Sequence, residues 1–472
     1  MARRRRLGPP HLIPIFTDIF LYAVIVPVIP FALRARIGVP EEDVQHWVSV
    51  LISVYGAALL VGSPVCGFLA DRMTNRKLPL ILGLLALAGA TLLLCLGKTI
   101  GILLAGRVLQ GISAAVVWTV GLALLADTVP PESVGQALGY VGISMSLGIL
   151  VAPLLGGIVY ANVGYYPVYF LAFGMIFLDI ILRFMLLEKK PARTWLREQT
   201  AAIREEQQEE KPDSTNPAAT NEESIPTIEP SLSNSSSQQH VNPFKALGIL
   251  LSSRRLLAAL VCTLFQSVLL TSWDATIPIY VNRIFGWSSL GAGLVFLPLI
   301  LPTFMAPLVG RWADKKGPRW PTVTGFLFAV PFLVLLRLVD HNSIRQKVLL
   351  CALLALTGLA ITNALTPLEA EIVYIVRHKE LTHPRAFGGR GAYATAYGLW
   401  NMAFAGGMLI GPLWGGFITQ GAGWGTMSWS LAILSAAGAG IAWLFIGGEV
   451  WKKTPPESGH EQNEQSITEQ GV

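Results

Sequence analysis

Long apolar runs alternate with short polar stretches along most of this chain. Each run is long enough to cross a bilayer as one helix, because about 20 residues at about 1.5 Å per residue span the hydrocarbon core. Twelve such runs lie at residues 12–33, 47–70, 78–97, 99–126, 136–160, 165–187, 256–282, 288–310, 320–338, 347–376, 391–418 and 424–447. The pattern predicts an all-α membrane protein with twelve transmembrane helices.

A polar segment divides the twelve runs into two groups of six. It is rich in Glu, Gln, Ser, Asn and Pro, and such a composition buries too little apolar surface to fold by itself. We expect an N-terminal six-helix half at residues 1–187, a disordered linker at 188–253, a C-terminal six-helix half at 254–450 and a polar tail at 451–472.

Lysine and arginine in the short loops predict the orientation in the membrane. Most of them follow the second, eighth and tenth runs or stand in the opening Met-Ala-Arg-Arg-Arg-Arg. Positively charged short loops stay on the cytoplasmic side. We therefore expect both termini, the linker and the tail to be cytoplasmic.

This orientation predicts that protease added to intact cells leaves the linker at residues 188–253 uncut. The same protease should cut it once the membrane is opened with detergent, because a disordered polar segment is readily cleaved. Immunoblotting of the two halves measures the result. Cleavage of the linker from outside intact cells would contradict the predicted topology.

Two motifs occur once in each half, in the same order and at the same span number. A loop motif follows the second and the eighth spans, and a small-residue motif lies in the fifth and the eleventh. The sequences are Gly67-Phe68-Leu69-Ala70-Asp71-Arg72 and Gly310-Arg311-Trp312-Ala313-Asp314-Lys315 for the loop, and Gly148-x-x-x-Ala152-Pro153-x-x-Gly156-Gly157 and Gly407-x-x-x-Gly411-Pro412-x-x-Gly415-Gly416 for the helix. The repeat predicts two six-helix halves related by a parallel duplication.

Each motif suggests a part of a gate. Small residues four apart let helix backbones approach closely, and proline bends a helix. Acids beside basic residues at helix ends can form charge pairs that break when one side of the protein opens. The gating candidates are Asp71, Arg72, Asp314, Pro153, Gly156, Gly157 and Pro412. The alternatives are tight packing for the helix motif and a membrane anchor for the loop motif.

Charged side chains inside the predicted spans are the main candidates for a transport site. Asp18 lies in the first span and Asp274 in the seventh, so each half opens with an intramembrane acid. Arg107 lies in the fourth span and Asp179 in the sixth, with Arg183 four residues further on. Glu369 and Glu371, near the cytoplasmic end of the tenth span, are expected at the membrane interface.

An acid inside the membrane is costly unless it is paired, protonated or exposed to water, so it usually marks a functional site. A carboxyl group in a cavity of low dielectric constant can exchange a proton near neutral pH, and a cationic amine can compete for the same place. Nearby aromatic rings can bind a cation; the candidates are Tyr22, Trp273, Tyr280, Trp400 and Phe404. The alternative for Asp18 is a structural role near the end of its helix.

Composition supports a membrane protein and argues against other classes. Only 14% of the 472 residues are charged, compared with about 25% in a typical soluble domain. The net charge of +6 comes from loops and does not indicate a nucleic-acid partner. The histidines fall outside the spans, so we expect no metal site. The sequence contains no recognisable nucleophile–base pair, so we do not expect an enzyme. We expect no cofactor, with a proton gradient as the energy source.

With these motifs, the chain resembles the major facilitator superfamily over all twelve spans. Arg107-x-x-Gln110-Gly111 resembles the motif that this family uses in proton coupling, and the fifth-span motif resembles the signature of its antiporters. The first copy of the loop motif departs from the family pattern at Thr74 and Asn75, and the fifth-span motif departs from it at Ala152.

Within the superfamily, the chain is most similar to drug–proton antiporters of the vesicular amine transporter type. The resemblance gives Asp18 an amine-binding role and makes Asp274 and Asp179 the acids of spans seven and six. It adds Asn363 and Asn401, which stand where these transporters carry acids. The long linker also resembles that of fungal plasma-membrane exporters of toxins and secondary metabolites.

The leading hypothesis is a proton-coupled exporter of a hydrophobic, cationic small molecule that works as a monomer by alternating access. The expected location is the plasma membrane, with a vacuolar or vesicular membrane as the alternative. Two other hypotheses stay open. One is a facilitator or symporter for nutrient uptake, and the other is a membrane receptor that transports nothing.

Overall fold

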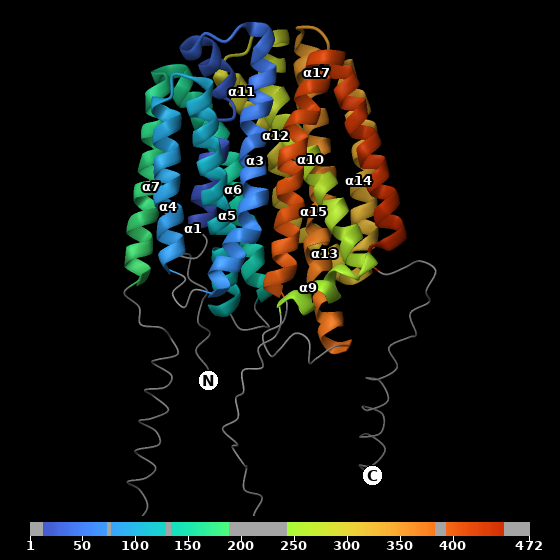
Figure 1. Ribbon diagram of the computed structural model, residues 1–472. Helices are drawn as coiled ribbons and strands as arrows, with labels where there is room; N and C mark the ends of the chain where they lie inside the picture. Colours follow the sequence, from blue (N-terminus) through green and yellow to red (C-terminus); the bar gives the residue numbers. More distant parts are fainter. Residues whose placement is uncertain (1–12, 73–76, 129–133, 188–242, 383–392, 448–472) are drawn as a thin grey trace, which may run out of the picture. The chain divides into compact units, whose positions relative to one another are not determined.

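The computed structural model describes residues 13–72, 77–128, 134–187, 243–382 and 393–447, and all regular structure in these ranges is helical. Figure 1 shows the long helices side by side in one bundle. The N-terminal helices are α1 (Ile13–Ala23), α2 (Ile29–Ala32), the π-helix η2 (Leu33–Ile37), α3 (Glu41–Arg72), α4 (Lys77–Leu96), α5 (Ile100–Thr128), α6 (Val134–Val163) and α7 (Tyr165–Leu187). The C-terminal helices are α9 (Pro243–Leu251), α10 (Arg254–Phe285), α11 (Ser289–Leu294), α12 (Phe296–Ile300), η4 (Leu301–Met305), α13 (Ala306–Lys316), α14 (Arg319–Leu335), η5 (Leu336–Leu338), α15 (Ile344–Thr382) and α17 (Tyr393–Phe445).

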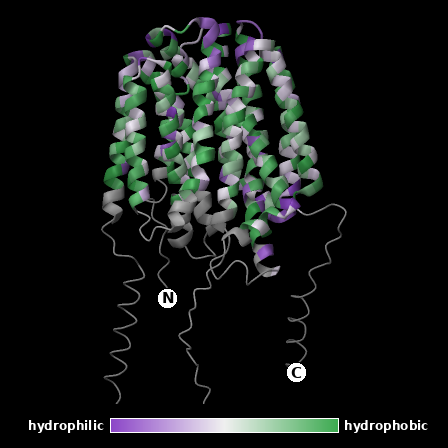
Figure 2. Cartoon of the chain, in the orientation of Figure 1, coloured by the Kyte–Doolittle hydropathy of each residue, from purple (hydrophilic) through white to green (hydrophobic). Residues whose placement is uncertain are grey.

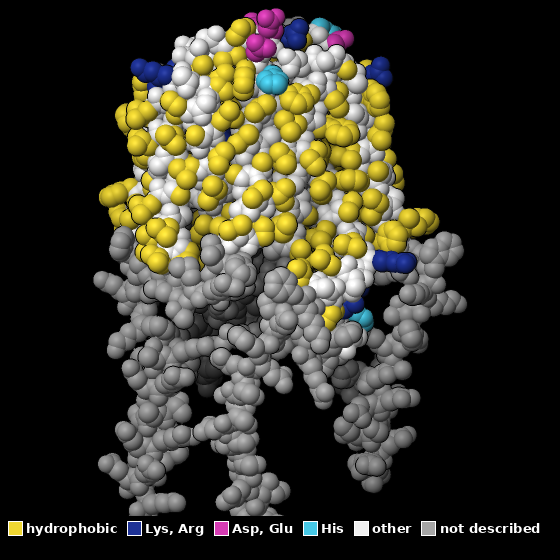
Figure 3. All heavy atoms as spheres, viewed as in Figure 1, with side chains coloured by type: hydrophobic (Ala, Val, Ile, Leu, Met, Phe, Trp, Pro, Cys, Tyr) yellow, Lys and Arg dark blue, Asp and Glu magenta, His cyan; other side chains and the backbone are white. Residues whose placement is uncertain are grey.

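The described helices account for the twelve predicted spans. Ten stretches are long and apolar enough to cross a membrane. One of them, the 48 residues of Gly398–Phe445 in α17, bends at Gly423, whose φ of 86° is not helical, and so supplies two spans. The twelfth is the interrupted first span formed by α1, α2 and η2. The apolar side chains cover the flank of the bundle, and charged ones gather at the upper rim (Figures 2 and 3).

Prolines interrupt the first span. Pro27 and Pro30 have no N–H group and cannot continue the pattern of i to i−4 hydrogen bonds. The chain forms a turn between α1 and α2, where the N–H of Val28 donates to the carbonyl of Ile25 at 2.9 Å. The eighth span is interrupted in the same way, as α11, α12, η4 and α13. In a membrane, such breaks occur where other parts of the protein cover the freed backbone groups.

The small-residue motif packs in the same way in both halves. In α6, Gly148 lies against Ile19 and Gly156 lies against the backbone of Val24, so the motif holds α6 to the first span of its own half. In α17, Gly407 lies against Ser267 and Gly415 against Ser272, so α17 is held in the same way to α10. The tight-packing role of the motif is therefore confirmed in both copies.

The last glycine of each motif faces the opposite half. Gly157 of α6 lies against the backbone of Ser289 in α11, and Gly416 of α17 lies against Ser49 in α3. Helices of both halves belong to one compact unit, made of residues 1–179 and 241–472. The boundaries predicted for the linker and the two halves stay a prediction.

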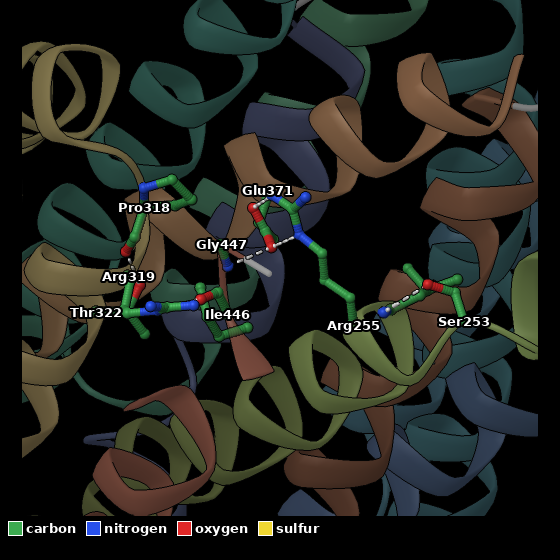
Figure 4. Close-up of polar contacts among 9 residues, drawn as sticks. Ser253, Arg255, Pro318, Arg319, Thr322, Glu371, Ile446 and Gly447 are labelled. Atoms are coloured by element: carbon green, nitrogen blue, oxygen red, sulfur yellow. Dashed lines mark hydrogen bonds and ion pairs between the residues drawn. The ribbon is translucent and has the colours of Figure 1, made fainter. Parts of the chain in front are cut away.

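A buried ion pair ties three helices of the C-terminal half together (Figure 4). Glu371 of α15 has no exposed surface. Its two carboxylate oxygens accept bonds from Nε and Nη2 of Arg255 at the start of α10, the second at 2.7 Å. It also accepts the backbone N–H of Gly447, just after α17, at 2.9 Å. These partners lie at helix ends, and the expectation that Glu371 lies at the membrane interface stays a prediction.

Candidate functional site

Asp18 lies on α1 with only 1% of its surface exposed. Its Oδ2 accepts hydrogen bonds from Trp118 Nε1 on α5 at 3.1 Å and from Tyr55 Oη on α3 at 3.4 Å. The carboxyl group therefore lies where three helices of the N-terminal half meet. Both of these donors are neutral groups.

Asp274 lies on α10 and forms a hydrogen bond across the two halves. Its Oδ2 accepts the hydroxyl of Tyr22 from α1 at 2.8 Å. The neighbouring Trp273 is fully buried and packs with its ring centroid 5.9 Å from that of Trp424. This packing fixes the rotation of α10 and directs Asp274 towards the N-terminal half.

Two aromatic rings and one arginine connect the acids. The rings of Tyr22 and Tyr55 have centroids 4.7 Å apart. The guanidinium of Arg107 on α5 lies 5.7 Å from the centroid of the Tyr22 ring and donates to Gln110 Oε1 at 2.9 Å. We call this group the acid–aromatic cluster; it consists of Asp18, Tyr22, Tyr55, Arg107, Trp118 and Asp274.

The acid–aromatic cluster has the chemistry of a site for protons and cations. Its carboxylates accept bonds from hydroxyl and indole groups, which can bond to an oxygen of either the charged or the neutral acid. The faces of Tyr22, Tyr55 and Trp118 can attract a positively charged ligand. The prediction that Asp18, Asp274 and Arg107 lie near one another agrees with this geometry, and their roles stay a prediction.

The other predicted site residues are not members of the acid–aromatic cluster. The Asn401 amide of α17 donates to Ser63 Oγ of α3 at 3.1 Å, so this residue joins the two halves. Asn363 donates to Thr324 Oγ1 of α14 at 3.0 Å and thus faces another helix of its own half. Asp179 is buried in α7. The side chain of Arg183 lies outside the described residues.

The gating candidates are only partly described. The side chains of Asp71 and Arg72, at the end of α3, lie outside the described residues. Asp314 of α13 accepts the hydroxyl of Tyr374 from α15 at 3.0 Å, a bond within the C-terminal half. A Cβ on Gly293 of α11 would lie 2.5 Å from the carbonyl oxygen of Pro153, so Pro153 lies at the contact between halves.

Hydrogen bonds between the halves gather at the upper end of the bundle in Figure 1, where α3 begins and α17 bends. Gln45 Nε2 of α3 donates to the Ala275 carbonyl of α10 at 2.9 Å. Arg34 donates to Asn282 Oδ1 at 3.0 Å, and Ser289 Oγ donates to the Gly157 carbonyl at 3.2 Å. These bonds close the upper end and must break for it to open.

Substitution of Gly157 by alanine should hold the upper end apart and slow transport. The added methyl group would overlap the backbone carbonyl of Ser289, which cannot rotate away as a side chain can. Overpacking of this kind costs about 1–3 kcal/mol, roughly a 5- to 150-fold shift in a two-state equilibrium. The initial rate of substrate movement in membrane vesicles measures the effect.

Gly142→Ala is the matched control for Gly157→Ala on the same helix. A Cβ on Gly142 meets no described atom within 4 Å, so this variant should transport at the normal rate. Membrane yield should be similar for both variants. Equal rates for Gly157→Ala and the unmodified protein would show that the close contact with Ser289 is not part of the gate.

A family model of the Major Facilitator Superfamily matches residues 13–380, which include the acid–aromatic cluster and both copies of the loop motif. The chain belongs to the major facilitator superfamily. It is therefore a multi-pass membrane transporter and not an enzyme. This confirms both the predicted fold and the resemblance noted from the motifs.

Curated members of the superfamily are similar to this transporter over different lengths. An uncharacterized MFS-type transporter of Schizosaccharomyces pombe is 35% identical over 86% of this chain and 88% of its own. The class B tetracycline resistance protein of Escherichia coli is 26% identical over 72% of this chain and 74% of its own. Probable vesicular acetylcholine transporter-B of Danio rerio is 35% identical over 34% of each chain.

A solved superfamily structure has the same fold. The human organic anion transporter MFSD10 (TETRAN) superposes with a TM-score of 0.63, covering 94% of this chain and all of that one, at 18% sequence identity. At this identity the likeness concerns the fold alone.

Two members of the acid–aromatic cluster of this transporter were missed by the sequence argument, namely Tyr55 and Trp118. Both are polar-tipped aromatics inside a predicted span, and a buried N–H or O–H needs a partner. Their position inside a span could therefore have pointed to them as partners of an intramembrane acid. By contrast, the predicted aromatics Tyr280 and Trp400 lie outside the cluster and pack within the C-terminal half. The ring centroids of Tyr280 and Trp424 are 3.8 Å apart, and those of Trp400 and Phe404 are 5.4 Å apart.

Proposed function

We propose that this transporter exports a hydrophobic, cationic small molecule in exchange for protons. The observation that carries the proposal is the acid–aromatic cluster. It contains two intramembrane carboxyl groups, one from each half, and both accept hydrogen bonds beside aromatic faces. An amine and a proton can compete for such a carboxyl group, and this competition is the basis of exchange.

The bond between Tyr22 and Asp274 suggests how the exchange is linked to opening. It joins the halves at 2.8 Å, so it must break or rearrange when they move apart. A charged Asp274 accepts this bond more strongly than a neutral one, because hydrogen bonds to ionised groups are roughly twice as strong. Proton uptake would therefore loosen this contact between the halves.

Superfamily relatives support a substrate of this class. One relative carries the name of a tetracycline resistance protein, and another that of a probable vesicular acetylcholine transporter; acetylcholine itself is a cation. Both names fit export or loading of small organic molecules. For this chain we propose the plasma membrane as the location.

Inside-out membrane vesicles containing the transporter provide the test. We expect a fluorescent lipophilic amine to accumulate inside them when the lumen is acidified, and to leak out when an ionophore collapses the pH gradient. Vesicles that lack the transporter are the control, because an acidic lumen also traps a weak amine by protonation alone, and only accumulation above that level is counted. Accumulation that is independent of the gradient would contradict proton coupling, and gradient-driven movement in the opposite direction would indicate uptake.

A further inference from the structure

Arg36 of η2 stacks on two tyrosines at the upper rim of the bundle. Its guanidinium carbon lies 4.3 Å from the centroid of the Tyr165 ring and 4.7 Å from that of Tyr166, both at the start of α7. The hydroxyl of Tyr165 donates to the carbonyl of Leu94, near the end of α4, at 2.5 Å. These contacts hold the half-buried guanidinium in a corner between η2, α4 and α7.

The charge in this corner has no acid beside it. Nε of Arg36 is buried without a partner, whereas Nη1 and Nη2 reach the surface and make no hydrogen bond or ion pair with the residues that the structure describes. No Asp or Glu occurs at residues 77–126 or 134–178, which include the upper ends of α4 to α7. Lys98, in the loop after α4, adds a second, exposed cation. Figure 3 shows basic side chains at the upper rim on this side of the bundle. The rim is therefore positively charged and can attract an anion.

An aromatic stripe runs down the outer face of α7 from the same corner. Tyr166 is 47% exposed, Phe170 67% and Phe177 64%. Residues four and seven positions apart lie on one face of a helix, so the three rings form a continuous surface. In a bilayer such a surface contacts acyl chains, and its upper end lies at the level of the headgroups.

We propose that Arg36 binds the phosphate of an anionic phospholipid, whose acyl chain lies along the stripe of Tyr166, Phe170 and Phe177. The rings contact the face of the guanidinium and leave the N–H groups of Nη1 and Nη2, which lie in its plane, for two phosphate oxygens. A lipid with a cationic headgroup would bring an ammonium group to a rim that already carries Arg36 and Lys98. The site therefore favours a lipid with net negative charge.

η2 connects the lipid site with the closed upper end. Two residues before Arg36, Arg34 donates to Asn282 of the opposite half at 3.0 Å and pairs with Glu41 at 3.4 Å. A lipid that fixes Arg36 would also hold Arg34 in place and so favour the closed upper end. The binding itself follows from charge and shape alone, so it does not depend on the proposed exchange of protons.

The experiment uses the full-length protein in phosphatidylcholine nanodiscs. They contain a trace of phosphatidylglycerol with a photoreactive diazirine in one acyl chain. After illumination, mass spectrometry of peptides measures the label on α7, with the label on α14, an apolar helix of the other half, as the internal reference. We expect labelling of α7 above this reference. Unlabelled phosphatidylglycerol should lower it, and the same amount of added phosphatidylcholine should not.

Three variants locate the lipid. Arg36→Gln should lower the label on α7 about 5-fold, the effect of one cation beside an anionic membrane lipid. Arg283→Gln is the matched control, because it removes an exposed positive charge outside the corner, at the end of α10, and should change nothing. If Arg36→Gln does not fold, Tyr166→Leu decides. It keeps the charge, removes a half-exposed ring from the corner and should weaken the label as well.

Four results would overturn the proposal. An unchanged label in a folded Arg36→Gln, or in Tyr166→Leu, would show that the corner does not hold the lipid. An equal loss in Arg283→Gln would assign the effect to the general charge of the rim. Competition by phosphatidylcholine as strong as by phosphatidylglycerol would exclude a preference for anionic lipid. Displacement by soluble glycerol phosphate would show that the corner takes a free phosphate without the acyl chain.

Discussion

Transport against a gradient should fall to the background of empty vesicles when Asp18 or Asp274 is replaced by asparagine. Asparagine keeps the size and the hydrogen-bonding oxygen of the side chain, but it is neutral in every state and cannot carry a proton. In this cluster the acids accept bonds from Tyr22, Tyr55 and Trp118, and an amide oxygen can accept the same bonds. The variants should therefore fold normally, and the loss should be specific to coupling.

Two further measurements separate proton coupling from substrate binding. Exchange of labelled for unlabelled substrate without a pH gradient should survive in a variant that has lost only its proton site. If binding of the cationic substrate is lost as well, the acid serves both ligands. Asp340→Asn is the matched control, because Asp340 is an exposed acid paired with His341 outside the helices, and it should transport normally. Full gradient-driven transport with normal affinity in both Asp→Asn variants would refute the proposed coupling site.

The second large effect is expected from Glu371→Gln, which should lower the stability of the C-terminal half. Glutamine cannot match the paired bonds of the carboxylate, so Arg255 keeps its charge without a partner. Breaking a buried pair in this way costs about 3–5 kcal/mol. Because the Arg255 side chain is 30% exposed and can reach water, we expect about 2–4 kcal/mol. The melting temperature of the purified protein measures the loss.

Two other variants test whether the loss comes from the ion pair. Glu369→Gln, two residues earlier on α15, should have a smaller effect, because Glu369 makes no hydrogen bond or ion pair with the side chains that the structure describes. The double variant with Arg255→Gln and Glu371→Gln should recover part of the stability, since no buried charge is then left alone. A double variant as unstable as the sum of the single ones would show that the two residues act independently.

The fold was largely predictable because membranes impose a simple pattern on sequence. Twelve apolar runs gave twelve spans, whereas the interruption of the first span at Pro27 and Pro30 was not predicted. The repeated glycines predicted close helix contacts, and the structure shows them at equivalent places in both halves. These features depend on helix length and on the absence of a side chain, which are read directly from the sequence.

The detailed site was less predictable because it depends on helix rotation and on pairing between distant helices. Trp118 and Tyr55 reach Asp18 only because α5 and α3 turn these rings inward. Asn363 was chosen from a resemblance, yet it bonds to Thr324 of α14. The burial of Glu371 depends on Arg255 and on the Gly447 N–H, which the sequence pattern did not indicate. Such partners lie more than 35 residues apart and leave no local signal.

The hydrogen bonds that close the upper end are formed without any carboxyl group. The Gln45 amide donates to a carbonyl, as does the Ser289 hydroxyl, and the Arg34 guanidinium donates to an amide oxygen. Arg34 also forms an ion pair with Glu41 at 3.4 Å. Turnover of the transporter can then be divided into two kinds of step. One kind separates the hydrogen bonds of the upper end, and the other is the proposed exchange of protons at Asp18 and Asp274 further inside.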